Sequence, residues 1–239
     1  APLQPATTSR DIFAIAGPAM LANLTTPLLG VVATAAIGQL GDATLLGGVA
    51  MASVIFDCLF WLFSFLRMGT IAFTAQALGA NRRSEFPALL LLGFIIARFV
   101  GVTLIVLQWP LSTLLFGAMG GSESVTDAAK TYFAVRIWSA PFTLANYVVL
   151  GWLVGQARAR VALAVQIAIN LVNMAVTVLL VLIAGWGIAG AATASVIAEI
   201  TGLVLGVAVA RHLLGGPSAA SRAEMPDRAK LTHMMAATR

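Results

Sequence analysis

Six long apolar stretches occupy nearly the whole of this 239-residue chain, and they restrict its fold more than any other feature of the sequence. A helix needs about 20 predominantly apolar residues to cross the hydrocarbon core of a bilayer. The chain is 60% hydrophobic and only 10% charged, whereas soluble domains carry about 25% charged residues. A membrane β-barrel would instead show short segments of alternating polarity. The sequence therefore predicts an all-α, polytopic membrane protein with six transmembrane helices.

Hydropathy and helix length place these six helices within residues 1–213, which we expect to form a single lobe. The expected spans are residues 11–38, 44–78, 86–116, 128–155, 160–184 and 188–213. Residues 214–239 change to Gly, Pro, Ser and mixed charge, which predicts a cytoplasmic linker. Because the chain begins with Ala and not Met, we expect it to be a fragment of a longer protein.

The loops between the expected helices alternate in charge. Basic residues collect after the second, fourth and sixth spans, with Arg82 and Arg83 in the first of these loops. The loops on the opposite side contain no Lys or Arg. Since basic residues gather in cytoplasmic loops, we expect both termini in the cytoplasm and the protein in a bacterial inner membrane. This asymmetry also explains the net charge of +5, so no nucleic-acid partner is expected.

Two carboxylic acids lie deep inside expected helices. Asp57 and Glu199 each end a near-copy of the same ten-residue phrase. A carboxylate in hydrocarbon is costly and usually marks a polar pathway or a buried partner. Either acid could serve as a proton- or cation-coupling group. Alternatively, each could be a buried structural group that is neutral or paired with Arg67 or Arg98.

The fifth expected helix carries four polar residues on one face, because their spacing of four, three and four matches the helical repeat. These residues are Gln166, Asn170, Asn173 and Thr177. A polar stripe on a membrane helix must face protein or water and not lipid. Two interpretations are open: hydrogen bonds between helices, or the wall of a solvated substrate cavity.

The first expected helix carries a similar polar face and two internal prolines. Asn23, Thr26 and Thr34 lie at one-face spacing and are candidate lining residues of a substrate or ion cavity. Pro18 and Pro27 each remove a backbone donor and favour a kink. The kink is either static or a hinge that bends during a transport cycle.

The sequence contains helix-packing motifs but no motif typical of an enzyme. Gly151–Gly155 and Gly202–Gly206 are GxxxG patterns, which predict close helix approach in lipid. Neither of the two lysines follows a glycine, so there is no Walker A sequence. No HExxH, CxxC or nucleophile elbow is present either. We therefore expect no enzyme activity, no metal site and no cofactor.

An ordered set of short phrases resembles the multidrug and toxic compound extrusion (MATE) transporters, especially their DinF-like branch. The phrases include Pro27-Leu-Leu-Gly30, Phe65-Leu-Arg67-Met68, Thr74-Ala-Gln-Ala-Leu-Gly79, Leu150-Gly-Trp-Leu153 and Ala194-Ser-Val-Ile-Ala-Glu199. The resemblance implies a fold of two six-helix lobes, of which this chain supplies the N-terminal one. Its partner would be the missing C-terminal lobe or a second copy of this lobe.

The resemblance also implies a secondary antiporter that exports organic cations, drugs or other amphipathic compounds in exchange for protons or sodium. In that family an aspartate on the first helix and another on the fifth shape a cation-responsive pocket. Here these positions fall on Ala33 and Thr177, so both acids are lost. Neither side chain changes charge at physiological pH. Coupling is therefore expected to involve Asp57 or Glu199, or to reside in the second lobe.

Two other functions are open at this point. One is a flippase for lipid-linked carbohydrates from the same superfamily, whose cavity should be rich in Arg and Lys. The other is a membrane scaffold that does not transport, which the loss of both family acids allows. Gradient-driven efflux of a fluorescent cation would separate all three.

Overall fold

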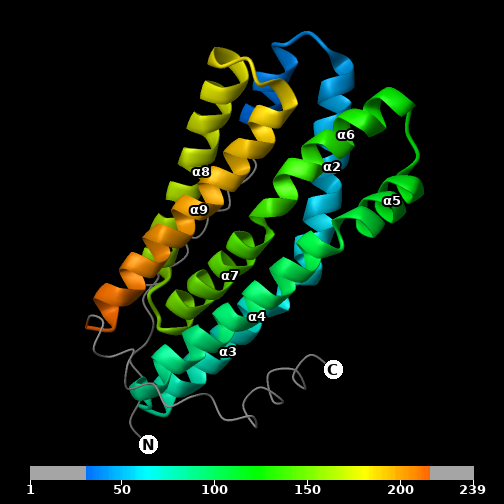
Figure 1. Ribbon diagram of the computed structural model, residues 1–239. Coiled ribbons are helices and arrows are strands. Elements are labelled where there is room, and N and C mark those ends of the chain that lie inside the picture. The colour runs from blue at the N-terminus through cyan, green and yellow to red at the C-terminus, as the bar shows by residue number, and fades with distance from the viewer. Residues whose placement is uncertain (1–30, 216–239) are drawn as a thin grey trace, which may run out of the picture.

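The computed structural model describes residues 31–215, which form helices joined by short turns with no strand in that range (Figure 1). After the end of a first helix at residues 31–38, the helices are α2 (Ala43–Leu62), α3 (Phe65–Gly79), α4 (Phe86–Val106), α5 (Gln108–Met119), α6 (Glu123–Arg136), α7 (Ala140–Gly155), α8 (Ala159–Val178) and α9 (Gly187–Leu213). The 3-10 turns η1 (Arg83–Glu85) and η2 (Ile137–Ser139) precede α4 and α7, and the π-helical turn η3 (Leu179–Ile183) follows α8. The predicted all-α class is confirmed.

Five segments in the described range are long and apolar enough to cross a membrane. They are Ala43–Gly79, Arg83–Val106, Glu123–Gly155, Ala159–Ile183 and Gly187–Leu213. The first expected span, at residues 11–38, falls mostly outside the described residues. The expected linker at residues 214–239 also lies almost wholly outside them.

Breaks divide three of the expected spans, and they correct the expectation of continuous helices. The helix expected at residues 86–116 stops at Val106 and restarts as α5. Pro110 has no N–H to donate to the Val106 carbonyl, so the helical hydrogen-bond ladder fails there. The span expected at residues 44–78 breaks between α2 and α3, where the sequence has no proline. A third break, η2, separates α6 from α7 just before Pro141, which removes a donor in the same way.

The α7 helix is the centre of the lobe. It packs against α3, α4, α8 and α9, while α2 packs against α6 on the far side of the break (Figure 1). In an apolar 18-residue window of the span that contains α7, 72% is buried, whereas the corresponding windows of the other four spans are between 22% and 39% buried. Trp152 of α7 is fully buried, and its Nε1 donates to the Phe86 carbonyl oxygen at 3.0 Å. This hydrogen bond ties the centre of the lobe to the start of α4.

Glycines let α7 approach its neighbours closely. A Cβ added to Gly151 would lie 2.7 Å from the carbonyl oxygen of Arg67 in α3. A Cβ added to Gly206 of α9 would lie 2.7 Å from Cγ1 of Val149 in α7. No side chain fits at such separations, so both GxxxG patterns mark close helix contacts in this fold.

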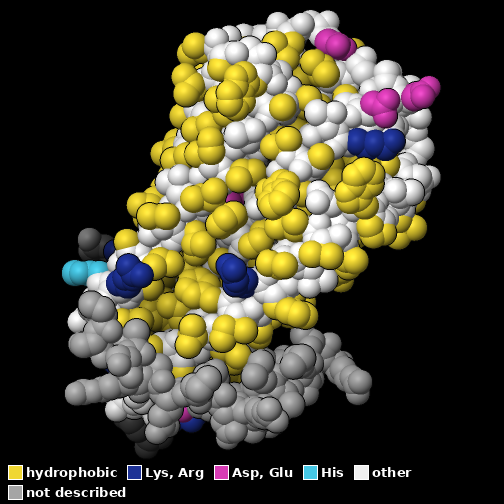
Figure 2. All heavy atoms as spheres, viewed as in Figure 1, with side chains coloured by type: hydrophobic (Ala, Val, Ile, Leu, Met, Phe, Trp, Pro, Cys, Tyr) yellow, Lys and Arg dark blue, Asp and Glu magenta, His cyan; other side chains and the backbone are white. Residues whose placement is uncertain are grey.

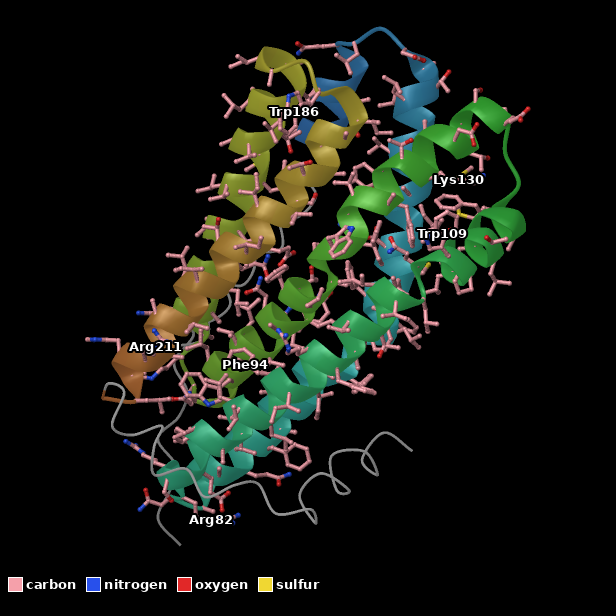
Figure 3. All side chains as sticks on the ribbon, in the orientation of Figure 1. Arg82, Phe94, Trp109, Lys130, Trp186 and Arg211 are labelled. Atoms are coloured by element: carbon pink, nitrogen blue, oxygen red, sulfur yellow. The ribbon has the colours of Figure 1, made fainter. Side chains whose placement is uncertain are left out.

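On the face that Figure 2 shows, the surface is largely hydrophobic, with most acidic side chains toward one end and Lys or Arg side chains nearer the other. Arg82 and Arg211 lie toward one end, and Lys130 and Trp186 lie toward the other (Figure 3). Within residues 31–215 the two ion pairs are Arg82–Glu85 at 3.0 Å and Lys130–Asp127 at 3.5 Å. This distribution suits a lobe whose sides face lipid or another lobe, because charge is costly in hydrocarbon.

Candidate functional site

Glu199 lies in the interior of α9 and is bound by a residue of α7. It stands about 18 Å along the helix from Gly187, the first residue of α9. Asn146 Nδ2 donates to Glu199 Oε2 at 2.7 Å and to the Glu199 backbone carbonyl oxygen at 2.9 Å. The two hydrogen bonds fix the carboxyl group against the centre of the lobe.

Two buried oxygen atoms beside this carboxyl group lack a hydrogen-bond partner. Asn146 is 2% exposed, and its Oδ1 has no partner in the described part of the chain. Thr143, one turn earlier on α7, is 6% exposed, and its Oγ1 has none there either. The Thr143 hydroxyl faces the Glu199 carboxyl group but lies outside hydrogen-bond geometry. We call Thr143, Asn146 and Glu199 the α7–α9 cluster.

Arg136 brings positive charge to the α7–α9 cluster from the end of α6. Its guanidinium interacts electrostatically with Glu199, although the two form no ion pair. Its Nη1 donates to the Tyr132 hydroxyl at 2.8 Å, and its guanidinium carbon lies 4.8 Å from the centre of the Phe56 ring. Aromatic faces stabilise a guanidinium in a partly buried position. Arg136 is therefore held at membrane depth by aromatic rings and not by an acid.

Tyr147, next to Asn146 on α7, belongs to a wider group of charges. Its phenol interacts electrostatically with Glu199, Arg67, Asp57 and Arg136. Among the residues that the structure describes, neither of the two acids is ion-paired with Arg67 or Arg98, the partners considered for a structural role. Within this range, Asp57 and Glu199 are thus not neutralised by an ion pair with either arginine.

The predicted polar stripe of α8 is a hydrogen-bonded ladder. Gln166 Nε2 donates to Asn170 Oδ1 at 3.2 Å, and Thr177 Oγ1 donates to Asn173 Oδ1 at 3.3 Å. Asn173 Nδ2 donates to Ser195 Oγ of α9 at 3.2 Å. Ser195 lies one turn before the acid of the α7–α9 cluster. The ladder and the cluster therefore adjoin along α9.

Asp57 has different surroundings from Glu199, although their sequence phrases match. It is exposed in the interior of α2, about 21 Å along the helix from Ala43. Its phrase packs on α6 through Gly48, where an added Cβ would lie 2.6 Å from Ala128 Cβ. The repeated phrase thus ends in one exposed acid and one hydrogen-bonded acid.

The structure places the remaining candidate residues in three settings. Thr34 is exposed and Ala33 is half-buried at the end of the first helix. Thr177, at the second lost acid position, is 1% exposed and bonded within the α8 ladder. The candidates outside the described residues are Pro18, Asn23, Thr26 and Pro27.

Our sequence reasoning did not select Thr143, Asn146 or Tyr147. The sequence does carry a signal for them. Thr143 and Asn146 are three residues apart inside the apolar α7, and Tyr147 follows directly. Arg136 lies about 20 Å along α6 from Glu123, next to Phe56.

Among the described residues, helices alone, with five segments long and apolar enough to cross a membrane, define a polytopic membrane protein. Residues 18–179 match the MatE family, and the chain belongs to this family of transporters, which are not enzymes. It is 38% identical over 209 residues to the DNA damage-inducible protein F of Escherichia coli, covering 87% of this chain and 46% of that protein. It is 28% identical to a probable multidrug resistance protein NorM of Caulobacter vibrioides, covering 72% and 36%.

Solved structures show the same fold. A MOP superfamily transporter from Pyrococcus furiosus superposes with a TM-score of 0.78 at 21% identity, covering 92% of this chain and 49% of that one. The chain thus spans about half the length of the relatives that it matches. This length fits the N-terminal lobe of the family.

Proposed function

We propose that this chain is the N-terminal lobe of a secondary active antiporter that exports organic cations, drugs or other amphipathic compounds in exchange for protons or sodium. The observation that carries the proposal is the Glu199 carboxyl group bound by Asn146 at membrane depth, beside the α8 ladder. Ionisable residues in such positions mark ion or proton pathways. The Caulobacter relative, named as a probable multidrug resistance protein, supports the substrate class.

In this proposal the substrate binds between this lobe and a second lobe. The exposed Asp57, the face of the first helix with Thr34, and the half-buried Gln166 and Asn173 of the α8 ladder line the cavity on this side. Ion binding at an acid stabilises one of two conformations more than the other, which drives export. Since Ala33 and Thr177 cannot change charge, the acids that respond are Glu199 and Asp57.

We further propose that the lobe lies in a bacterial inner membrane with both termini in the cytoplasm. The basic end, with Arg82 and Arg211, would then face the cytoplasm (Figure 3). Its protein partner is the C-terminal lobe or a second copy of this lobe. The exposed face of α2 and α3, which includes Trp61 and Met68, is available for that contact.

The test uses the full natural polypeptide in proteoliposomes that contain a fluorescent organic cation. Imposed proton and sodium gradients should each be tried, with Glu199→Gln and Asp57→Asn as variants. Asp127→Asn is the control, because Asp127 pairs with Lys130 at one end of the lobe. We expect gradient-driven transport in the wild type and control, and a loss of about tenfold or more in at least one of the two variants.

Three outcomes would contradict parts of this proposal. Unchanged gradient dependence in both variants would remove Glu199 and Asp57 as coupling acids. Movement of lipid-linked carbohydrate without movement of the cation would indicate a flippase. The absence of any transport by the correctly folded polypeptide would indicate a scaffold.

A further inference from the structure

We propose that Arg98 of α4 binds the phosphate group of a phospholipid from the leaflet at the basic end of the lobe, where Arg82 and Arg211 lie. The acyl chains of this phospholipid lie along the exposed face of α4. The inference goes beyond the proposed export function, because it concerns the lipid-facing surface of the lobe and its test requires no transport.

The exposed face of α4 is an apolar strip that contains one charge. Four apolar side chains of this face are between 44% and 72% exposed, and we call them the α4 strip. They are Leu91, Ile95, Phe99 and Val102. Arg98, the one charged residue of α4, is also exposed and lies on the same face, because it follows Ile95 by three residues and precedes Val102 by four. The guanidinium is therefore set among side chains that suit lipid.

Arg98 lies in the interior of a span long and apolar enough to cross a membrane. It stands about 18 Å along the helix from Phe86 and about 12 Å from Val106, the two ends of α4. Within residues 31–215 it forms no ion pair and no hydrogen bond. An unpaired charge at membrane depth is costly. An anionic group from outside these residues should therefore neutralise it.

The direction of the side chain favours the leaflet at the basic end. Side chains of a helix lean toward its N-terminus, and α4 begins just after Arg82. Phe94, one turn before Arg98, lies nearer Arg82 than Lys130 (Figure 3), and α5 leads from Val106 toward the opposite end (Figure 1). The methylene stem of Arg98 extends its guanidinium further toward the basic end. The phosphates of that leaflet are thus the nearest anionic groups that the membrane supplies.

The composition of the α4 strip favours a lipid over a helix of another protein. Helices that associate in lipid place small residues at their contact. The glycines of α4, Gly93 and Gly101, face α7 on the opposite side, whereas the α4 strip consists of large side chains. A guanidinium can donate two hydrogen bonds to one phosphate group. A phospholipid therefore matches both the charge of Arg98 and the apolar surface around it.

Lipid binding can be measured on the purified protein. The full natural polypeptide is stripped of lipid in a maltoside detergent, and its thermal unfolding is followed as dioleoyl phosphatidylglycerol is added at constant ionic strength. A ligand that binds only the folded state raises the unfolding midpoint by mass action. Dioleoylglycerol, which has the same chains without phosphate, and inorganic phosphate, which has no chains, are added in parallel. These two probes separate the contribution of the chains from that of the phosphate.

Two variants remove the proposed contact, and a third serves as the control. Arg98→Leu replaces the guanidinium with an apolar side chain, and Arg98→Gln replaces it with a neutral polar one. Arg83→Leu is the matched control, because Arg83 is exposed in η1 at the basic end, outside the α4 strip. It changes the net charge of the polypeptide by the same amount as Arg98→Leu.

We expect phosphatidylglycerol to raise the midpoint of the wild type and of Arg83→Leu. Its apparent affinity should fall about tenfold or more in Arg98→Leu and in Arg98→Gln, because each loses charge-assisted hydrogen bonds to the phosphate. Dioleoylglycerol and inorganic phosphate should shift the midpoint less, and equally in all variants. If Arg98→Leu fails to fold, Arg98→Gln decides alone.

Three results would overturn the proposal. Undiminished affinity in both Arg98 variants would show that the phosphate is not bound there. An equal loss in Arg83→Leu would indicate a general attraction between the lipid and the basic end. The third is a wild type that does not respond to phosphatidylglycerol. If light scattering then showed a dimer that Arg98→Leu converts to a monomer, Arg98 would belong to a contact between two copies of the chain.

Discussion

At the scale of single residues, two asparagines of the lobe use their amides differently. Asn173 uses both ends, since its Oδ1 accepts from Thr177 and its Nδ2 donates to Ser195. Asn146 uses its nitrogen for both bonds to Glu199, and its Oδ1 has no partner in the described range. The α8 amide is therefore a completed structural link, whereas the α7 amide retains an open acceptor.

Trp152 gives a test of side-chain packing at the same scale. Trp152→Phe removes the donor to the Phe86 carbonyl and leaves a small void in the centre of the lobe. We expect a loss of about 1–3 kcal/mol in the free energy of unfolding, measured by thermal unfolding in detergent. Trp61→Phe is the control, because Trp61 is 77% exposed and should change stability little. Equal losses in the two variants would show that the buried hydrogen bond contributes nothing.

At the scale of elements, contact between α4 and α7 depends on the absence of side chains at two glycines. A Cβ added to Gly101 would lie 2.6 Å from the backbone nitrogen of Pro141, and one added to Gly93 would meet the side chain of Val148. Backbone atoms near a proline cannot move aside as a side chain can. The α4–α7 separation is therefore fixed most strictly at Gly101.

Two Gly→Ala substitutions in helix interiors should consequently change the free energy of unfolding in opposite directions. Gly101→Ala forces α4 and α7 apart and should cost about 1–3 kcal/mol of stability. Gly69→Ala in α3 meets nothing within 4 Å, so it should stabilise by up to about 1 kcal/mol, because alanine favours the helix. Thermal unfolding of both variants under one condition checks the prediction. A stabilising Gly101→Ala would show that the two helices lie further apart than described.

The sequence predicted where most elements lie but not how they pair. Uninterrupted apolar runs located the long helical segments, and Pro110 and Pro141 offered a signal for two of the three breaks that we did not use. The repeated ten-residue phrase located Glu199, and helical periodicity located the α8 stripe. Asn146 was not found because its partner lies 53 residues further along the chain. Local spacing does not encode which helix faces which.

At the scale of the whole molecule, the lobe has one basic end and one end whose loops carry no Lys or Arg. This asymmetry predicts which loops meet the cytoplasm. The test uses single cysteines at Ser84 and Ser122, both exposed, after Cys58→Ser. An impermeant maleimide should label Ser122→Cys in intact cells and Ser84→Cys only after permeabilisation. The reverse pattern would contradict cytoplasmic termini.

The burial of the α7 span bears on how the protein is made. Among the 18-residue apolar windows of the five candidate spans, the window in Glu123–Gly155 is the least hydrophobic and has the largest buried share, 72%. During synthesis, insertion of the Glu123–Gly155 span into lipid alone is therefore the least favourable of the five. Packing against helices that are already inserted stabilises this span most. Two candidate spans, Ala43–Gly79 and Arg83–Val106, precede it and supply α3 and α4, two of its packing partners. The order of the helices along the chain thus allows α3 and α4 to be in the membrane before α7 is inserted beside them.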